Sequence, residues 1–146
     1  MTHEEASRYI QSRMAKQAQA DTGYDAQLEE YWSAFPAGVG LVMRAGETAQ
    51  AGFVYRKGAP YLLTHYDLIE LMVRSQGRCE LSGIPFSDEQ IPGCSRRPFI
   101  PSIDRIKPKE PYIFDNCRLV CWAVNRALGE WGDEVFWRIV KSAAAT

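Results

Sequence analysis

The sequence predicts an α+β domain whose centre is a β-hairpin that runs into a helix. Residues 99–103 and 117–120 have the character of two short strands, and the proline-containing segment 107–111 lies between them as a loop. Residues 122–128 then carry apolar side chains at helical spacing and end at Gly129, a residue that commonly follows a helix. Flanking helices and a helical N-terminal extension complete the predicted architecture.

The N-terminal part of the chain predicts two helices. Thr2 and Glu5 have the spacing of a capping box, so a helix is expected to begin here and to continue to about Ala20. Residues 21–23 interrupt it. A second helix is expected to end before Pro36 and to carry apolar side chains on one face: Leu28, Tyr31 and Trp32.

Residues 36–60 predict a boundary between two parts of the chain. Residues 36–50 are rich in Gly and Ala and indicate no particular element, whereas the aromatic and β-branched residues of 52–56 indicate a short strand. Residues 57–60 are Lys-Gly-Ala-Pro, which favours a turn. We therefore expect a helical accessory segment over residues 1–60 and a second domain over residues 61–146.

The second domain is expected to begin with a capped helix. Thr64 and Asp67 form another capping box, and an apolar stripe follows until the helix ends near Gly77. Residues 79–86 predict a tight knuckle, and a last helix is expected to begin near Asp133. The spacing of the apolar residues in and before that helix predicts that they are core residues: Trp122, Val135, Phe136, Trp137, Ile139 and Val140.

The composition is that of one ordinary globular domain. Of the 146 residues, 46% are hydrophobic and 24% are charged, and no apolar run approaches the roughly 18 residues that span a bilayer. The first five residues are polar and acidic, unlike a secretory signal, and the four cysteines show no dense spacing pattern. We therefore expect no membrane association and a place in the cytoplasm.

Basic side chains are concentrated in one stretch, although the net charge is only −1. Such a local excess is typical of a phosphate-binding surface, and it is also compatible with an ordinary solvated face. The candidate nucleic-acid-binding residues are Arg96, Arg97, Arg105, Lys107, Lys109, Arg118 and Arg126.

One carboxylate in the hairpin and one carboxamide in the following helix are candidate metal ligands. Asp104 lies in the first strand region and Asn125 lies in the helix after the second strand. Oxygen donors of this kind suit a single hard cation such as Mg²⁺ or Mn²⁺. Taken one at a time, the same residues are compatible with a surface ion pair beside Arg105, an Asx turn at Asn116 and an exposed helix position.

The hairpin and helix resemble the HNH endonuclease family, in the branch that has Arg after the aspartate and is found in phages and mobile elements. The matching residues are Ser102 to Ile106, Tyr112, Asn116 to Cys121, and Asn125, and the preceding Cys79-x-x-Ser82-Gly83-x-Pro85-Phe86 is similar to the family's knuckle. The resemblance covers roughly residues 64–145.

This resemblance implies a ββα-metal fold that cleaves phosphodiester bonds in DNA with one Mg²⁺ or Mn²⁺ ion. Asp104 and Asn125 are the implied metal ligands, and Asn116 is implied to tie the hairpin loop to the strand. Arg105 or Arg126 is expected to clamp a phosphate oxygen. The implied catalytic set is therefore Asp104, Arg105, Asn116 and Asn125.

The general base is the first departure from the family pattern. Most members carry histidine where this chain has Arg105, and a guanidinium stays protonated at any accessible pH. The sequence leaves the base open among a hydroxide on the metal ion, His65, Tyr112 and Glu110.

The structural zinc of many family members is the second departure. In the two C-x-x-C motifs, Ser82 stands in place of the cysteine after Cys79, and Val124 stands in place of the cysteine after Cys121. Each motif therefore keeps one thiol, whereas structural zinc takes four ligands. We expect no zinc, and we expect Cys79 and Cys121 to lie close together as small buried residues. The knuckle is then expected to be held by apolar packing of Leu81, Ile84, Phe86 and Trp122.

Two other interpretations of the chain stay open. A degenerate HNH-like domain would bind DNA or a protein partner without cutting it. An unrelated α+β module would not bring Asp104, Asn116 and Asn125 toward one site.

Overall fold

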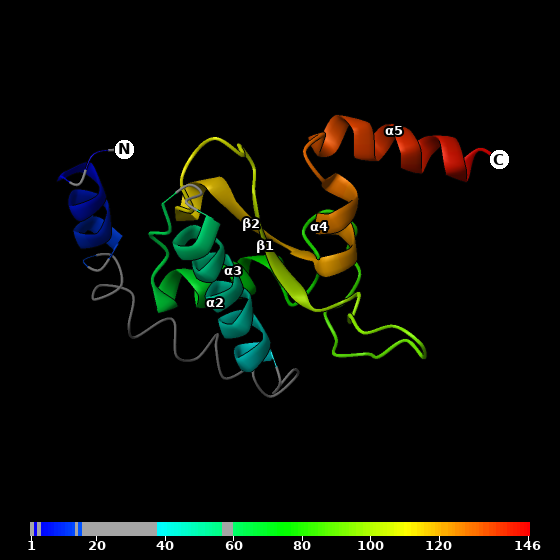
Figure 1. Cartoon of the computed structure of the whole chain (residues 1–146), viewed down its shortest axis with the longest axis horizontal. Coiled ribbons are helices and arrows are strands. Elements are labelled where there is room, and N and C mark those ends of the chain that lie inside the picture. Colours follow the sequence, from blue (N-terminus) through cyan, green and yellow to red (C-terminus); the bar gives the residue numbers. More distant parts are fainter. Residues whose placement is uncertain (1, 3, 14, 16–37, 57–59) are drawn as a thin grey trace.

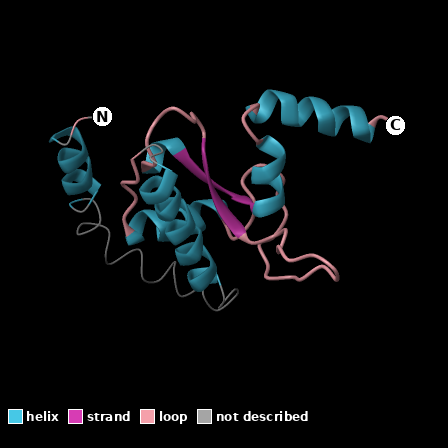
Figure 2. Cartoon of the chain, viewed as in Figure 1, coloured by secondary structure: helices cyan, strands magenta, loops and turns pink. Residues whose placement is uncertain are grey.

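Helices surround a two-stranded antiparallel sheet in the part of the chain that the structure describes (Figure 1). The structure is a computed structural model that describes residues 2, 4–13, 15, 38–56 and 60–146. Its elements are a helix over residues 4–13, α2 (Gly38–Arg56), α3 (His65–Ser75), β1 (Pro101–Arg105), the 3₁₀ turn η1 (Phe114–Asn116), β2 (Cys117–Cys121), α4 (Trp122–Leu128) and α5 (Gly132–Ala144). The predicted α+β class is confirmed. Figure 2 shows α2 and α3 on one side of the sheet and α4 and α5 on the other.

The hairpin has a simple register in which Asp104 lies opposite Arg118 and Ser102 lies opposite Val120. Because side chains alternate along a strand, these four residues share one face of the sheet. Ile103 and its partner Leu119 lie on the other face, where both are buried. Both strands were predicted within two residues of their bounds, and α4 ends before Gly129 as expected.

The outer edge of β2 is occupied by backbone and side-chain groups from outside the sheet. Both backbone groups of Leu119 bond to Glu80, with Glu80 N donating to the Leu119 carbonyl at 2.8 Å and the Glu80 carboxylate accepting from Leu119 N at 2.6 Å. Arg74 donates to the Cys117 carbonyl at 2.8 Å and also pairs with the Glu80 carboxylate. These contacts tie the knuckle and α3 to the strand.

Both predicted capping boxes are present. At α3, Thr64 accepts from Asp67 N at 3.1 Å and Asp67 accepts from Thr64 N at 2.8 Å. At the N-terminus, Thr2 and Glu5 make the same reciprocal pair. The part of the first helix expected beyond residue 15, and the whole second helix expected before Pro36, lie outside the described residues.

The short strand expected at 52–56 is wrong, because α2 continues through these residues to Arg56. One of the glycines that obscured this helix, Gly46, allows close packing. A Cβ on Gly46 would lie 2.6 Å from the Leu68 side chain and 2.9 Å from the Tyr61 hydroxyl, so a larger residue here would force these side chains to shift. Val42 is fully buried in the same core as the sheet.

The N-terminal helix is attached to the rest of the fold by polar contacts. Arg13 donates to the fully buried Asp67 at 2.7 Å, pairs with Glu70, and lies 4.3 Å from the ring centre of Phe114. Tyr9 accepts from Phe114 N at 2.6 Å. Because Asp67 is buried, its charge requires such a partner.

The last helix corrects one further expectation. α5 extends away from the body of the molecule in Figure 1, and none of its residues is buried. Ile139 is 60% exposed, and Trp137 and Val140 are also exposed, whereas Phe136 packs partly against the core. Helical spacing predicts an apolar face correctly but does not say whether another element covers it.

Candidate functional site

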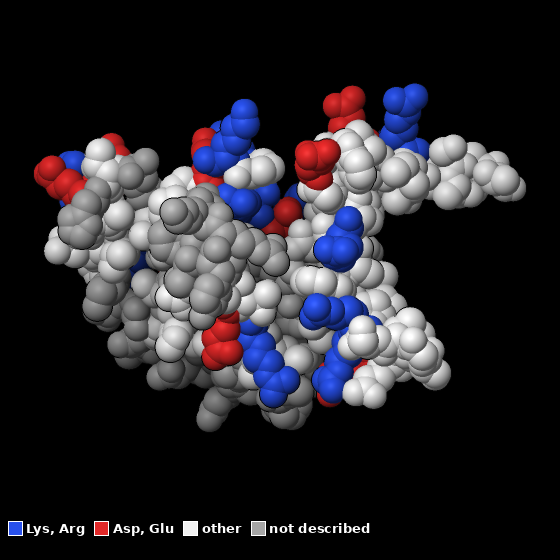
Figure 3. Space-filling view, viewed as in Figure 1, with Lys and Arg blue, Asp and Glu red and all other residues white. Residues whose placement is uncertain are grey.

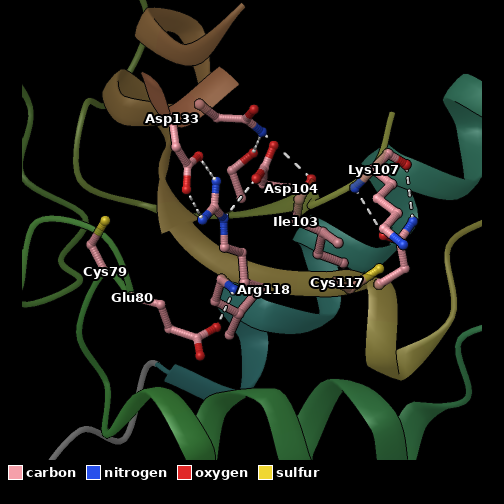
Figure 4. A network of polar contacts seen from close by, with 12 residues as sticks. Cys79, Glu80, Ile103, Asp104, Lys107, Cys117, Arg118 and Asp133 are labelled. Atoms are coloured by element: carbon pink, nitrogen blue, oxygen red, sulfur yellow. Dashed lines mark hydrogen bonds and ion pairs between the residues drawn. The ribbon is translucent and has the colours of Figure 1, made fainter. Parts of the chain in front are cut away.

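Three charged side chains meet on the hairpin face that carries Asp104 (Figure 4). The Arg118 Nε donates to one Asp104 oxygen at 2.8 Å. Its two terminal nitrogens donate to Asp133, one of them at 2.8 Å. Asp133 belongs to the first turn of α5, so the guanidinium joins the sheet to the last helix.

Burial controls the electrostatics of this group. Desolvation raises the pKa of Asp104, and the hydrogen bond and charge of Arg118 oppose that rise without cancelling it. The Arg118 hydrogen bond lowers the pKa of Asp133, which is 47% exposed and loses less solvation. The pKa of Arg118 is raised, chiefly by its hydrogen bonds to Asp133. Asp104 therefore requires a neighbouring cation more than Asp133 does.

The Asn125 carboxamide lies beside the same strand. Its Nδ2 donates to the Ser102 hydroxyl at 2.7 Å and approaches the Ile103 carbonyl at 3.5 Å. Ile103 is directly bonded to Asp104, and Ser102 shares the Asp104 face. The first turn of α4 follows β2 without a loop, which carries Asn125 back over the sheet.

Asn116 holds the hairpin loop. Its Oδ1 accepts from Lys107 N at 2.9 Å, and its Nδ2 donates to the carbonyls of Lys107 and Pro111 at 3.1 and 3.0 Å. The side chain is 4% exposed. These contacts connect both ends of the loop to the start of β2, so Asn116 has a positioning role there.

Arg105 points away from the Asp104 face, as strand alternation requires. Its guanidinium lies 4.6 Å from the ring centre of Tyr112 and donates to the Glu110 carbonyl at 3.3 Å. The Glu110 carboxylate is exposed and pairs with Lys107. Two of the candidate bases, Tyr112 and Glu110, are therefore gathered around Arg105 and the loop.

The third side-chain candidate for the base, His65, begins α3 and is exposed. It lines an open cavity of about 520 Å³ between α2 and α3, together with Glu47 and Tyr61. None of the hairpin residues lines this cavity. The capping box at Thr64 explains the position of His65 as a first-turn residue.

The predicted basic residues fall into separate groups. Arg96, from the loop before β1, and Arg126, from α4, both lie against the Trp122 ring at 5.6 and 5.8 Å from its centre. In Figure 3, Lys and Arg side chains lie over α4 and the neighbouring loop. Arg97 is half-buried and Lys109 is exposed. Arg118, in contrast, is 15% exposed and is held by two carboxylates.

The two remaining thiols of the knuckle positions lie together. Cys79 and Cys121 are buried, and a hydrogen bond between their side chains lowers the pKa of Cys79 and raises the pKa of Cys121. Ser82 N also donates to the Cys79 sulfur at 3.4 Å. Among the expected knuckle residues, Phe86 is buried, whereas Ile84 is 39% exposed.

The donor types fit a hard cation better than a soft one. Asp104 is a half-buried carboxylate, and the Asn125 carboxamide, whose nitrogen bonds to Ser102, carries an oxygen as its other donor atom. Within the described ranges, His, Cys, Asp and Glu side chains do not gather in threes as a metal-binding group. Waters or phosphate oxygens would have to complete the coordination of any ion held by Asp104 and Asn125.

Sequence reasoning missed Asp133, and it included Ser102 in the matching motif without predicting its contact with Asn125. Asp133 was interpreted only as a helix start, and it lies 15 positions after Arg118 with no regular pattern that would link the two residues. The opposite charges of Arg118 and Asp133 were the only sequence signal for this ion pair. Ser102 lies two residues before Asp104, and strand alternation alone would have placed it on the same face.

The chain matches no model of a known protein family, no curated protein and no solved structure. Among the described residues, none of the helices is long and apolar enough to span a membrane.

Proposed function

We propose that the protein is a metal-dependent DNA endonuclease of the HNH type, with a ββα-metal core formed by β1, β2 and α4. The observation that carries the proposal is the approach of the α4 carboxamide of Asn125 to the strand that bears Asp104, through Ser102 and the Ile103 carbonyl. Asn125 therefore lies beside the strand that bears Asp104, which supports a shared role for the two residues. This position also disfavours the interpretation of an unrelated module in which these residues lie apart.

In this proposal the chain's own residues bind and orient the ion and the substrate. Asp104 and Asn125 would hold one Mg²⁺ or Mn²⁺ ion, and Asn116 ties the hairpin loop to the start of β2. A bound ion supplies Lewis-acid stabilisation of the negative charge that builds on the phosphoryl and leaving oxygens. Arg96 and Arg126, which both lie close to the Trp122 ring, would bind DNA phosphates.

The alternative function is DNA binding without cleavage. Two observations favour it: Arg105 occupies the position of the usual base and lies on Tyr112, and Asp104 is already paired with Arg118. Tyr112 and Glu110 stay candidate bases beside Arg105. A site that cannot activate water would still present the basic side chains of Arg96 and Arg126.

A supercoiled-plasmid assay with Mg²⁺ or Mn²⁺ tests the proposal, with wild type beside Asp104→Ala and an EDTA control. We expect metal-dependent nicking or linearisation that Asp104→Ala abolishes. The matched control is Asp88→Ala, which removes an exposed carboxylate from the loop before β1. Asp88→Ala should cleave like wild type. Absence of cleavage with both metals, together with a DNA mobility shift, would support the non-cleaving alternative instead.

A further inference from the structure

Arg118 occupies a position between two carboxylates that a cation would also favour. Its side chain lies opposite Asp104 in the hairpin register, where cross-strand neighbours are close enough for direct contact. The Nε bonds to Asp104 and the terminal nitrogens bond to Asp133 (Figure 4). Each edge of the planar guanidinium therefore has its own carboxylate.

The two carboxylates differ in how strongly they need this partner. The Asp104 side chain is 14% exposed, whereas Asp133 is 47% exposed. An ion held at Asp104 would lie next to the guanidinium that bonds to one Asp104 oxygen, and its charge would repel that guanidinium. Asp133 makes the paired contacts with the other edge, so it can keep the guanidinium when Asp104 releases it.

We propose that Arg118 is a built-in competitor for the metal ion, which leaves Asp104 when the ion binds and is then retained by Asp133. This inference rests on the proposed metal site. In it Arg118 and Asp133 are positioning residues, and Asp133 is not a metal ligand. The protein would consequently bind the ion more weakly than its two oxygen ligands alone allow.

Mn²⁺ affinity, measured by the free-ion electron paramagnetic resonance signal, tests this exchange without any dependence on cleavage. Arg118→Gln should bind Mn²⁺ about tenfold more tightly than wild type, which corresponds to about 1.4 kcal/mol. Asp133→Asn should weaken binding, because Arg118 then pairs with Asp104 alone. In the Arg118→Gln background, Asp133→Asn should have no effect.

The control for net charge is Arg138→Gln, which removes an exposed guanidinium from α5 and should leave Mn²⁺ affinity unchanged. Equal affinities of Arg118→Gln and wild type would overturn the inference. A weakening by Asp133→Asn that persists in the Arg118→Gln background would also overturn it, because Asp133 would then be a ligand itself.

A measurement on the unmodified chain covers the case in which Arg118→Gln does not fold. The Arg118 Nε–H resonance, assigned in isotope-labelled wild-type protein, should shift when Mg²⁺ is added. An unchanged resonance at saturating Mg²⁺ would refute the exchange. If wild type binds Mn²⁺ and Asp104→Ala does not, but Arg118→Gln has no effect, only this inference fails. If none of the variants binds Mn²⁺, the proposed metal site fails and this inference fails with it.

Discussion

Replacement of Asn116 by alanine should destabilise the protein substantially, because one buried side chain makes three hydrogen bonds. The bonds to Lys107 N, the Lys107 carbonyl and the Pro111 carbonyl span 2.9–3.1 Å. At about 1 kcal/mol for each bond, the free energy of unfolding should fall by about 3 kcal/mol. For a domain of this size, that loss corresponds to a melting temperature lower by roughly 10 °C.

Urea unfolding followed by tryptophan fluorescence measures the change. The matched control is Gln90→Ala, which removes an exposed amide from the loop before β1 and should change stability by less than about 0.5 kcal/mol. A loss below about 1 kcal/mol in Asn116→Ala would refute the reasoning that three net hydrogen bonds hold the loop.

Asn116→Asp provides a sharper version of the same test. An ionised carboxylate keeps the bond from Lys107 N but places oxygen against the carbonyls of Lys107 and Pro111, which are acceptors. The folded state should therefore favour the protonated acid, so the variant should regain stability as the pH falls toward 4. A stability difference from wild type that is independent of pH would contradict this assignment of donors and acceptors.

Two other predictions concern packing and charge. Gly46→Ala should lower the free energy of unfolding by about 1–3 kcal/mol, because its Cβ would lie 2.6 Å from the Leu68 side chain. Gly40→Ala has no atom within 4 Å of its Cβ, so it should stabilise α2 by about 0.5–1 kcal/mol. Equal melting temperatures of the two variants would argue against the close contact of α2 with α3. Arg118 lowers the pKa of Asp133 in the folded protein, so this carboxylate stabilises the fold above its ordinary pKa, and that stabilisation is lost as the pH falls through its lowered folded value. Asp133→Asn should therefore be less stable than wild type at pH 7, by under about 1 kcal/mol because the pair is partly exposed. The difference in melting temperature should shrink as the pH falls below the ordinary pKa of an aspartate; a difference that does not change with pH in this range would exclude the pair as the cause.

Local signals in the sequence predicted the elements whose causes are local. The capping box of Thr64 and Asp67 can be recognised from four consecutive residues. The end of α4 can be recognised from Gly129 alone. The hairpin follows from two short strands on either side of a proline-containing loop. Asn125 is one turn into the helix after β2, so its return to the hairpin follows from the absence of an intervening loop.

The parts that were mispredicted depend on residues far apart in the sequence. Gly46 resembles a loop glycine until Leu68 and Tyr61 are placed against it. Trp137 and Ile139 lie at core-like spacing, but their exposure depends on whether any other segment covers α5. The pairing of Arg118 with Asp133 depends on the direction in which α5 leaves α4, which no local pattern encodes.

The contacts of Glu80 have a consequence for aggregation. A two-stranded sheet has two unpaired edges, and an exposed strand edge can recruit a strand from another molecule into an extended assembly. The Glu80 backbone and carboxylate already use both main-chain groups of Leu119, and Arg74 uses the Cys117 carbonyl. A foreign strand would have to displace charged side chains to pair with β2. The knuckle therefore protects the β2 edge of this small sheet from intermolecular β-pairing, in addition to joining that strand to α3.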